Sequence, residues 1–476
     1  MTDDLFELDA VTVADGVRRG ELRAADVLEH HLERIERLNP DLNAFVFLDA
    51  DRARRVAAAI DAQVDAGENP GPLAGVPLGI KELESVEGWP DTRASVVFRD
   101  RVGTATTVMS SRLLAAGAVP VGLTASPEWG LLFFTNSNLH GVTRNPWKLD
   151  RTPGGSSGGA GAALAAGLVP LATGSDMGGS IRLPAGWCGV VGVKGTYGRV
   201  PRSPGYIGGS NMIHYGPLAR SVTDAARYLD CVCGVDGRDP GSLPVPAVPF
   251  EQALNTSLVG LKAAVALETN LTPADADVRT VVSQAAAELI KVAELEEVGG
   301  VRLNLPPLNT LGGAIIAADL DPEVAPLFGE IAASIASTEG AAPLLALAAD
   351  PTAMTLEGVA SFNAMRHQLN QALAEIFERV DLLLLPTSPV PAPGAAGPVP
   401  TVVDGREVGA SASGAFTYPF NISGHPVVSV PAGMVDGAPV GMQIVARRHE
   451  DALALAAAYA FEKAKPWPKL APMARG

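Results

Sequence analysis

Apolar positions in the first part of the chain repeat with the period of an α-helix. Between residues 27 and 35 they recur at three- and four-residue spacing, with Glu and Arg among them: Val27, Leu28, His31, Leu32 and Ile35. Such spacing places apolar side chains on one face of a helix. The pattern returns over 52–64, so it predicts helices over 9–66, which the GENPGP stretch at 67–72 ends.

Short apolar runs follow this helical part, and helical patterns separate them. The runs predict β-strands over 76–80, 119–123, 168–172, 261–267, 301–305 and 381–387. The helical patterns predict helices over 107–116, 160–167, 221–233, 276–292 and 452–465, and a mostly helical segment over 310–380. Two further runs, 427–430 and 440–445, flank a turn at Asp436 and Gly437 and predict a hairpin. Strands that alternate with helices indicate one large α/β domain over 1–476.

Composition and charge narrow the class of protein. Of the 476 residues 47% are hydrophobic and 18% are charged, which is typical of a globular protein. The net charge of −16 argues against nucleic acid or an anionic membrane as partner, because both bind basic surfaces. The three cysteines fit neither a disulfide framework nor a metal site, and no motif calls for a cofactor. The N-terminus lacks the layout of a signal peptide, so we expect a cytoplasmic protein.

A glycine-rich stretch over 154–196 carries the candidate chemistry. It holds two serines, Ser156 in GGSSGG and Ser180 in DMGGS, each in a turn, with a predicted helix and strand between them. Glycines let successive backbone N–H groups point the same way. The N–H groups at the second turn could therefore stabilise an oxyanion, each being worth roughly 3 kcal/mol in a transition state. These donors are Met177, Gly178, Gly179 and Ser180.

A serine nucleophile needs a base that removes its proton. The seven histidines are scattered, and none lies close to either serine in sequence. Lys81 ends the apolar run 76–80, where burial would lower its pKa and keep it neutral. Ser156 could pass the proton between Ser180 and Lys81, because a hydroxyl both donates and accepts. GGSSGG alone is typical of a flexible linker, but GVPLGIK upstream and DMGGSIR downstream together indicate a catalytic centre.

These three motifs resemble the amidase signature family, as do GVTRNPW at 141–147 and FNISGHPVVSVPAG at 420–433. The resemblance implies a mixed central sheet that helices cover on both faces. It implies that Lys81 is the general base, that Ser156 is a bridging serine beside a cis peptide bond, and that Ser180 is the acyl-enzyme nucleophile. The backbone of 177–180 would form the oxyanion hole. Ser157 and Arg182 would give hydrogen-bonding support.

The resemblance also divides the chain into an N-terminal helical segment (1–70), a signature core (71–235) and a variable helical segment (305–380). With the loops at 389–426, the variable segment usually shapes the substrate pocket of the family, and both are apolar and alanine-rich here. We therefore expect an apolar or aromatic acyl group. The family also makes a homodimer plausible.

Several residues depart from the pattern of the family. Glu82 replaces the common aspartate after the lysine, and Ala125 replaces an asparagine. Met177 and Leu183 differ from the threonine and glutamine of the amidase subunit that works with tRNA, which argues against that role.

The sequence therefore predicts an amidase that hydrolyses a linear or cyclic carboxylic amide, a small molecule, to a carboxylate plus ammonia or an amine through an acyl-Ser180 intermediate. Three alternatives stay open: a glutamine-hydrolysing subunit of a tRNA-dependent amidotransferase, an α/β-hydrolase-type esterase with Ser157 in a G-x-S-x-G motif, and an inactive binding module. A nitrilase would need a nucleophilic cysteine, and Cys188 lies in an apolar run. A P-loop is excluded, because neither glycine turn is followed by GK[ST].

Overall fold

Three helices form the N-terminal part of the chain in the computed structural model, which describes residues 5–204, 210–299, 301–306, 324–342 and 355–475. They are α1 (Ala10–Arg18), α2 (Ala24–Leu42) and α3 (Ala50–Asp65). Asp9 and Asp49 cap α1 and α3, where their carboxylates accept hydrogen bonds from the Thr12 and Arg52 N–H groups. The prediction of an all-helical segment missed one strand, β1 (Phe45–Leu48), because four residues show no clear period and β1 forms by pairing with a distant strand.

The strands of the described residues form one large mixed sheet, with the order β1-β3-β2-β6-β8-β7-β14-β15-β11-β9-β10. Its members after β1 are β2 (Pro77–Lys81), β3 (Val119–Thr124), β6 (Leu171–Asp176), β7 (Val191–Lys194), β8 (His214–Ala219), β9 (Lys262–Val265), β10 (Glu296–Glu297), β11 (Leu382–Pro386), β14 (Val427–Val435) and β15 (Ala438–Ala446). Two small pairs lie outside it: β4 (Asn136–Ser137) with β5 (Gly141–Val142), and β12 (Val402–Val403) with β13 (Arg406–Glu407).

Most predicted strands are present, and one is wrong. The segment 301–305 is not a strand: Leu303 makes one isolated bridge to Thr269, because β10 takes the edge position beside β9. The strand predicted over 168–172 starts later and runs to Asp176, which carries it directly into the turn before Ser180. The sequence analysis missed β7 and β8, which hold four and six residues with few strong strand formers.

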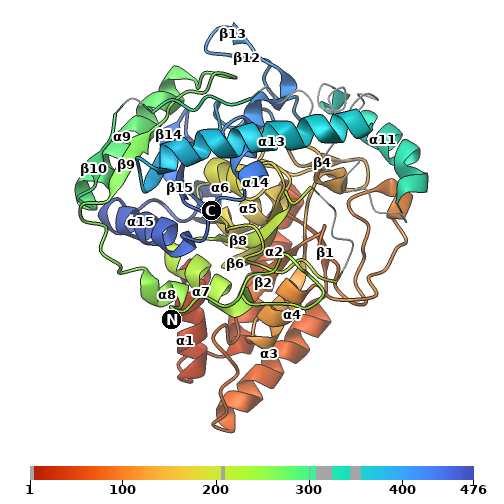
Figure 1. Ribbon diagram of the computed structural model, residues 1–476. Helices are drawn as coiled ribbons and strands as arrows, with labels where there is room; N and C mark the ends of the chain where they lie inside the picture. The colour runs from red at the N-terminus through yellow and green to blue at the C-terminus, as the bar shows by residue number, and fades with distance from the viewer. Residues whose placement is uncertain (1–4, 205–209, 300, 307–323, 343–354, 476) are drawn as a thin grey trace.

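The helices form two layers against the sheet (Figure 1). The short helices α5 (Gly158–Ala165) and α6 (Arg182–Cys188) pack side by side, α5 on β2 and β6, and α6 on β14 and β15. A second layer packs on β8, β11 and the hairpin and holds α7 (Val222–Val232), α9 (Ala276–Val292) and α15 (Asp451–Ala464). The remaining helices are α4 (Val108–Ala115), α8 (Phe250–Ala253), α11 (Phe328–Ala336), α13 (Leu356–Phe377) and α14 (Tyr418–Ser423). A single α/β domain with a helix-covered mixed sheet confirms the predicted fold class.

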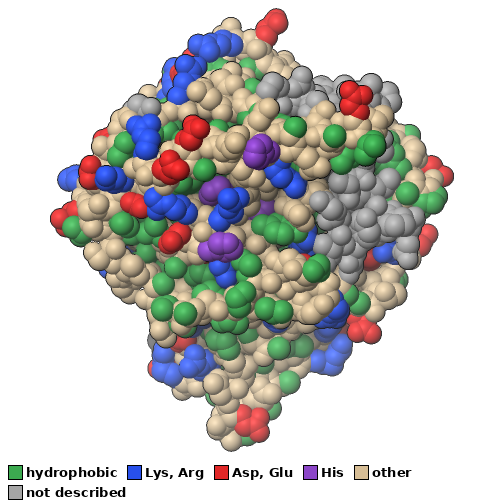
Figure 2. Space-filling view, in the orientation of Figure 1, with side chains coloured by type: hydrophobic (Ala, Val, Ile, Leu, Met, Phe, Trp, Pro, Cys, Tyr) green, Lys and Arg blue, Asp and Glu red, His purple; other side chains and the backbone are tan. Residues whose placement is uncertain are grey.

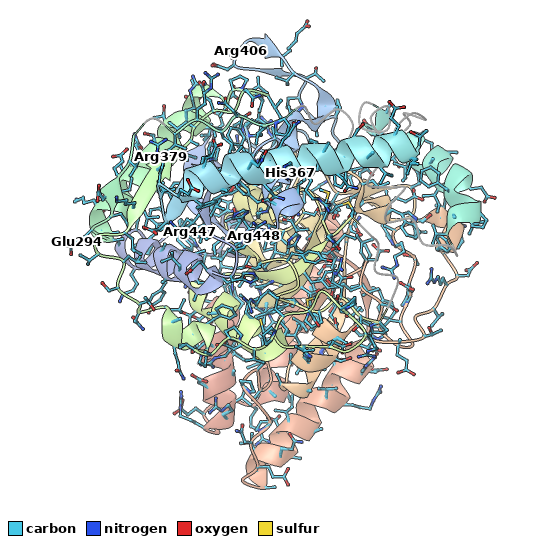
Figure 3. The ribbon with its side chains drawn as sticks, in the orientation of Figure 1. Glu294, His367, Arg379, Arg406, Arg447 and Arg448 are labelled. Carbon is cyan, nitrogen blue, oxygen red and sulfur yellow. The ribbon has the colours of Figure 1, made fainter. Side chains whose placement is uncertain are left out.

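The part predicted as mostly helical contains α11 and the long α13, while 307–323 and 343–354 lie outside the described residues. Helix α13 crosses the molecule in front of α14 (Figure 1). Arg447 closes its C-terminal end: the guanidinium donates to the carbonyl oxygens of Phe377 and Val380 and pairs with Asp381 at 2.6 Å (Figure 3). A cation at this end of a helix offsets its dipole and satisfies its last carbonyl groups.

The predicted hairpin of β14 and β15 is confirmed, and it lies in the middle of the sheet between β7 and β11. The surface above it carries mixed charge: on the face in Figure 2, Lys and Arg side chains lie among Asp and Glu side chains. No helix among the described residues has the length and apolar character needed to cross a bilayer.

Candidate active site

The topology of the sheet brings the three sequence motifs to one edge. Strands β2 and β6 are parallel neighbours, so the carboxyl end of β2, with Lys81, lies beside the carboxyl end of β6. Helix α5 precedes β6 and runs back along the sheet, which places Ser156 and Ser157 at the same edge. There the Ser157 N–H donates to the Ser180 carbonyl oxygen at 3.1 Å. The two glycine-serine turns are therefore joined directly.

Lys81 is fully buried at this edge. Its Nζ atom donates to Ser156 Oγ at 2.8 Å, to Ser175 Oγ at 3.0 Å and to the Ser175 carbonyl oxygen at 3.2 Å. Burial lowers the pKa of Lys81 to about 7, against the carboxylates of Glu84 and Asp176, which act to raise it. A large fraction of the lysine is therefore neutral near neutral pH.

Ser156 is 3% exposed and follows a cis peptide bond from Gly155. The chain around it is closely packed. A Cβ atom at Gly155 would lie 2.5 Å from the Leu132 carbonyl oxygen, and one at Gly130 would lie 3.1 Å from Ser156 Oγ. Glycine is required at these two positions because backbone and hydroxyl approach so closely.

Ser180 is partly exposed, in contrast to Lys81 and Ser156. The turn before it is held by Asp176, which accepts hydrogen bonds from the Gly179 N–H at 2.7 Å and the Ile181 N–H at 3.2 Å. Gly179 has φ +128°, and a Cβ atom there would lie 2.6 Å from Thr417 Oγ1. Within the predicted oxyanion hole, the Gly179 N–H is therefore engaged in fixing the turn.

Arg182 holds Asp176 from the other side. Its Nε and Nη2 atoms each lie 2.9 Å from a carboxylate oxygen of Asp176, and both side chains are completely buried. Asn421 and Gln443, on α14 and β15, bind the same arginine. Burial acts to raise the pKa of Asp176, but the charge and hydrogen bonds of Arg182 outweigh it and hold that pKa well below its usual range. Sequence reasoning placed Arg182 here as support, but it missed Asp176.

An aromatic cluster lies next to the turn. The ring of Tyr418 is so close to Gly178 that a Cβ atom there would lie 2.3 Å from it, and the Thr417 hydroxyl donates to the Gly178 carbonyl oxygen at 2.5 Å. The ring of Phe133 meets Tyr418 edge-on at 5.8 Å. Leu183 and residues of α11 belong to the same hydrophobic cluster. The sequence analysis assigned 129–134 to the core, whereas Phe133 belongs to this smaller cluster beside the turn.

Other candidate residues have different surroundings. Glu82 does not join the lysine; it accepts hydrogen bonds from Thr92 Oγ1 and the Ala94 N–H and lies 2.6 Å from His140 Nε2. Ser157 is buried and donates to the Ser175 carbonyl oxygen at 3.4 Å. Cys188 is buried in α6, where burial raises the pKa of its thiol far above the usual value. The described residues contain no group of three or more metal-ligating side chains.

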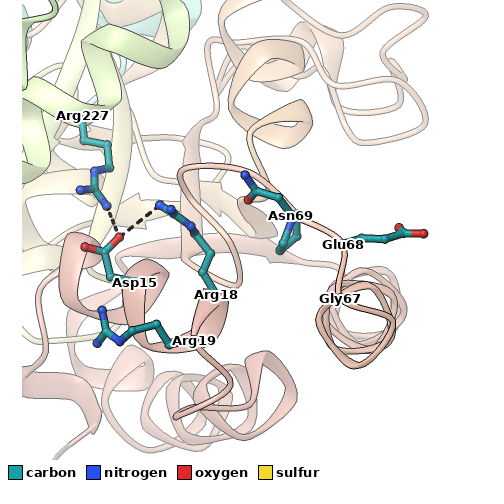
Figure 4. Close-up of a pocket in the computed structure, with 8 residues that line it drawn as sticks. Asp15, Arg18, Arg19, Gly67, Glu68, Asn69 and Arg227 are labelled. Carbon is teal, nitrogen blue, oxygen red and sulfur yellow. Dashed lines mark hydrogen bonds and ion pairs between the residues drawn. The ribbon is translucent and has the colours of Figure 1, made fainter.

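A surface cavity of about 600 Å³ lies elsewhere, between α1, the 67–70 loop and α7 (Figure 4). Its charged side chains already bind one another: Asp15 Oδ1 lies 2.7 Å from Arg227 Nη1 and 3.4 Å from Arg18 Nη1. None of the candidate catalytic residues lines this cavity.

Comparisons with known proteins agree along nearly the whole chain. The family model Amidase matches residues 26–455. The acylamidase of Rhodococcus erythropolis is 34% identical over 469 residues, which cover 98% of this chain and 97% of that one. The amidase-type component of the glutamyl-tRNA(Gln) amidotransferase of Synechococcus sp. (strain RCC307) is 34% identical over 95% of this chain and 96% of its own.

A solved structure shows the same likeness in three dimensions. A bacterial aryl acylamidase of the amidase signature family superposes with a TM-score of 0.84 at 31% identity, covering 97% of this chain and 96% of that one. Sequence and structure thus agree over almost the full length of each relative. The chain belongs to the amidase family, the amidase signature enzymes that hydrolyse amides.

Proposed function

We propose that the enzyme cleaves a small carboxylic amide to a carboxylate plus ammonia or an amine through an ester on Ser180. The observation that carries the proposal is the 2.8 Å hydrogen bond between buried Lys81 Nζ and Ser156 Oγ, at the turn whose neighbour holds Ser180. A neutral amine, a hydroxyl that can relay a proton and a partly exposed hydroxyl are the parts that acyl transfer by serine requires.

The proposed reaction has two halves. Neutral Lys81 takes the Ser156 hydroxyl proton while Ser156 takes the proton of Ser180, and Ser180 Oγ attacks the carbonyl carbon. When the C–N bond breaks, the proton returns from Lys81 through Ser156 to the leaving nitrogen. Water then attacks the ester, gives its proton to the same relay, and releases the carboxylate as Ser180 regains its proton.

The oxyanion would be held by the backbone of the turn at 177–180. Asp176 fixes that turn through the Gly179 N–H. We therefore assign the stabilising hydrogen bonds to the N–H groups of Met177, Gly178 and Ser180, each worth roughly 3 kcal/mol in the transition state. Because Arg182 keeps Asp176 ionised, the donors are set before substrate binds.

The acyl group is proposed to be apolar or aromatic. Phe133, Tyr418 and Leu183 surround the turn with apolar surface, and the related proteins include an acylamidase and an aryl acylamidase. The variable segment within 305–380 supplies part of this surface: Ser334 of α11 donates to Glu128 Oε2 at 2.7 Å. We keep the division into a 1–70 segment, a 71–235 core and a 305–380 segment as part of this proposal.

The test compares Ser180→Ala, Lys81→Ala and Ser156→Ala with the parent enzyme. Each variant is assayed on aliphatic, aryl and cyclic amides, with ammonia and amine release both measured. We expect loss of activity in all three, and an ester on Ser180 in the parent enzyme by mass spectrometry. Lys291→Ala, which removes an exposed lysine of α9, is the control. Full activity of Ser180→Ala contradicts the proposal, and a serine-directed probe on Ser157 favours the esterase alternative.

A second function is supported by the 34% identity to a component of an amidotransferase. In that case the same centre would release ammonia from glutamine for a partner protein. Glutaminase activity together with stable co-purification of a tRNA-binding partner would favour it over a free-standing amidase. A homodimer and a cytoplasmic location stay predictions, which light scattering and cell fractionation test.

A further inference from the structure

We propose that Glu84 is a positioning residue whose buried carboxyl group sets the proton affinity of Lys81. The inference rests on the proposed role of Lys81 as the base. It adds a second titratable group to that role, one that touches neither substrate nor serine.

Glu84 is close to Lys81 in the fold as well as in sequence. Its N–H donates to the Lys81 carbonyl oxygen at 2.9 Å, in the turn that follows β2, and its side chain is 1% exposed. Thr173 of β6 joins the two residues: its Oγ1 accepts a hydrogen bond from the Lys81 N–H at 2.9 Å, and its hydroxyl stabilises the ionised carboxylate of Glu84. Ser110 of α4 lies 3.5 Å from Glu84 Oε2.

The carboxyl group of Glu84 is incompletely satisfied. Its Oε1 atom is buried without a hydrogen-bond partner among the described residues, and so is the Tyr228 hydroxyl of α7. A buried carboxylate with a bare oxygen is unstable relative to its protonated form. Burial accordingly raises the pKa of Glu84 to about 7, the value to which burial lowers the pKa of Lys81.

The charges around the pair single out Glu84. Two carboxylates act on Lys81, those of Glu84 and Asp176. Asp176 is neutralised by Arg182 and stays ionised, so its influence is constant. Glu84 forms no ion pair among the described residues; Lys81 and Arg93 act on it from a distance, and the phenols of Tyr215 and Tyr228 stay neutral beside it.

Two groups that interact and titrate in one range share their protons. When the pair has lost its last proton, Lys81 is a neutral amine beside a Glu84 carboxylate. The proton that Lys81 then receives from the serines forms an ammonium ion, which the carboxylate stabilises in a dry site. Glu84 therefore makes a desolvated lysine a stronger base than burial alone would allow.

The experiment is the pH profile of kcat/KM for Glu84→Gln, with Glu84→Asp and Glu84→Met alongside. Loss of the negative charge lowers the pKa of Lys81, so we expect the acid limb to move to lower pH by about one unit in the Gln and Met variants. The plateau at high pH falls as well, because the base is weaker. Glu84→Asp keeps the charge and is expected to restore the midpoint in part.

A merely structural role would lower the plateau without moving the midpoint. Tyr228→Phe is the matched control, because it removes a buried hydroxyl beside Glu84 and leaves the charge in place; its midpoint is expected to be unchanged. Glu84→Met has an apolar side chain in a buried site and is the variant to use if Glu84→Gln does not fold. The pH dependence of Ser180 labelling by a fluorophosphonate gives the same midpoint without a substrate.

The two proposals fail differently. Activity in Lys81→Ala overturns the role of the lysine and with it the inference. If Lys81→Ala is inactive but the Gln and Met variants keep the parent midpoint, the proposed function stands and the role of Glu84 is wrong.

Discussion

Arg182 reaches both carboxylate oxygens of Asp176 at 2.9 Å, in a place where neither side chain meets solvent. The pair joins the turn before Ser180 to α6, and through Asn421 and Gln443 to α14 and β15. The geometry of the turn therefore depends on residues from both halves of the chain.

Arg182→Met is expected to destabilise the fold, because it leaves the charge of Asp176 buried and unpaired. Breaking one side of a buried pair costs about 3–5 kcal/mol of the free energy of unfolding. Urea denaturation measures the change. Arg238→Ala, which breaks an exposed pair with Asp236, serves as control and is expected to leave the denaturation midpoint unchanged. A midpoint for Arg182→Met equal to that of the control contradicts the prediction.

Gly179→Ala is expected to lower kcat/KM about 100-fold or more, the effect of losing an oxyanion donor. The residue has φ +128°, and its added methyl group would meet Thr417 Oγ1 at 2.6 Å, so the turn must shift. Steady-state kinetics measures the loss. Gly237→Ala, at a position with nothing within 4 Å of the new Cβ atom, is the control. Parent-like kinetics of Gly179→Ala would mean that the turn tolerates displacement.

Activity is expected to rise with pH through about 7 and then to level off. Lys81 acts as a base only when neutral, and burial lowers its pKa from 10.5 to about 7, so the neutral form dominates above that pH. Measuring kcat/KM between pH 5 and pH 10 tests this. Lys81→Arg keeps a charge at every pH in that range and is expected to be inactive throughout. An acid limb near the ordinary pKa of lysine would place the amine in water.

Tyr418→Leu is expected to lower kcat/KM for aryl amides more than for short aliphatic amides. The ring packs on Gly178 and meets Phe133 edge-on, so a bound aromatic group would gain contact from it. The ratio of the two specificity constants is the measurement. Tyr459→Leu on α15 controls for loss of a tyrosine away from the turn. An unchanged ratio would remove Tyr418 from the acyl pocket.

Local patterns predicted much of the fold. The apolar runs ending at Lys81 and preceding the 389–400 loop became β2 and β11, and the Asp436–Gly437 turn became the hairpin. Local pattern failed where pairing decides: 301–305 has apolar alternation but lost the sheet edge to β10, and β1 is too short to show a period.

The candidate site divides in the same way. The motif glycines pointed to both serine turns, and the apolar run pointed to Lys81. The partners that fix these groups could not be read from spacing, because they come from far along the chain: Asn421 lies 245 residues from Asp176. Glu84 carries no motif of its own, and its burial beside Thr173 follows only from the parallel pairing of β2 and β6.

The late hairpin of β14 and β15 separates β7 from β11 in the finished sheet. During synthesis on the ribosome, a growing polypeptide therefore exposes its reactive hydroxyls long before the strands that align them have been translated. Hydrolytic power should switch on in a single late event, when this hairpin inserts between two waiting half-sheets. Nascent copies stalled before that event would be inert and harmless to other amides in the cell.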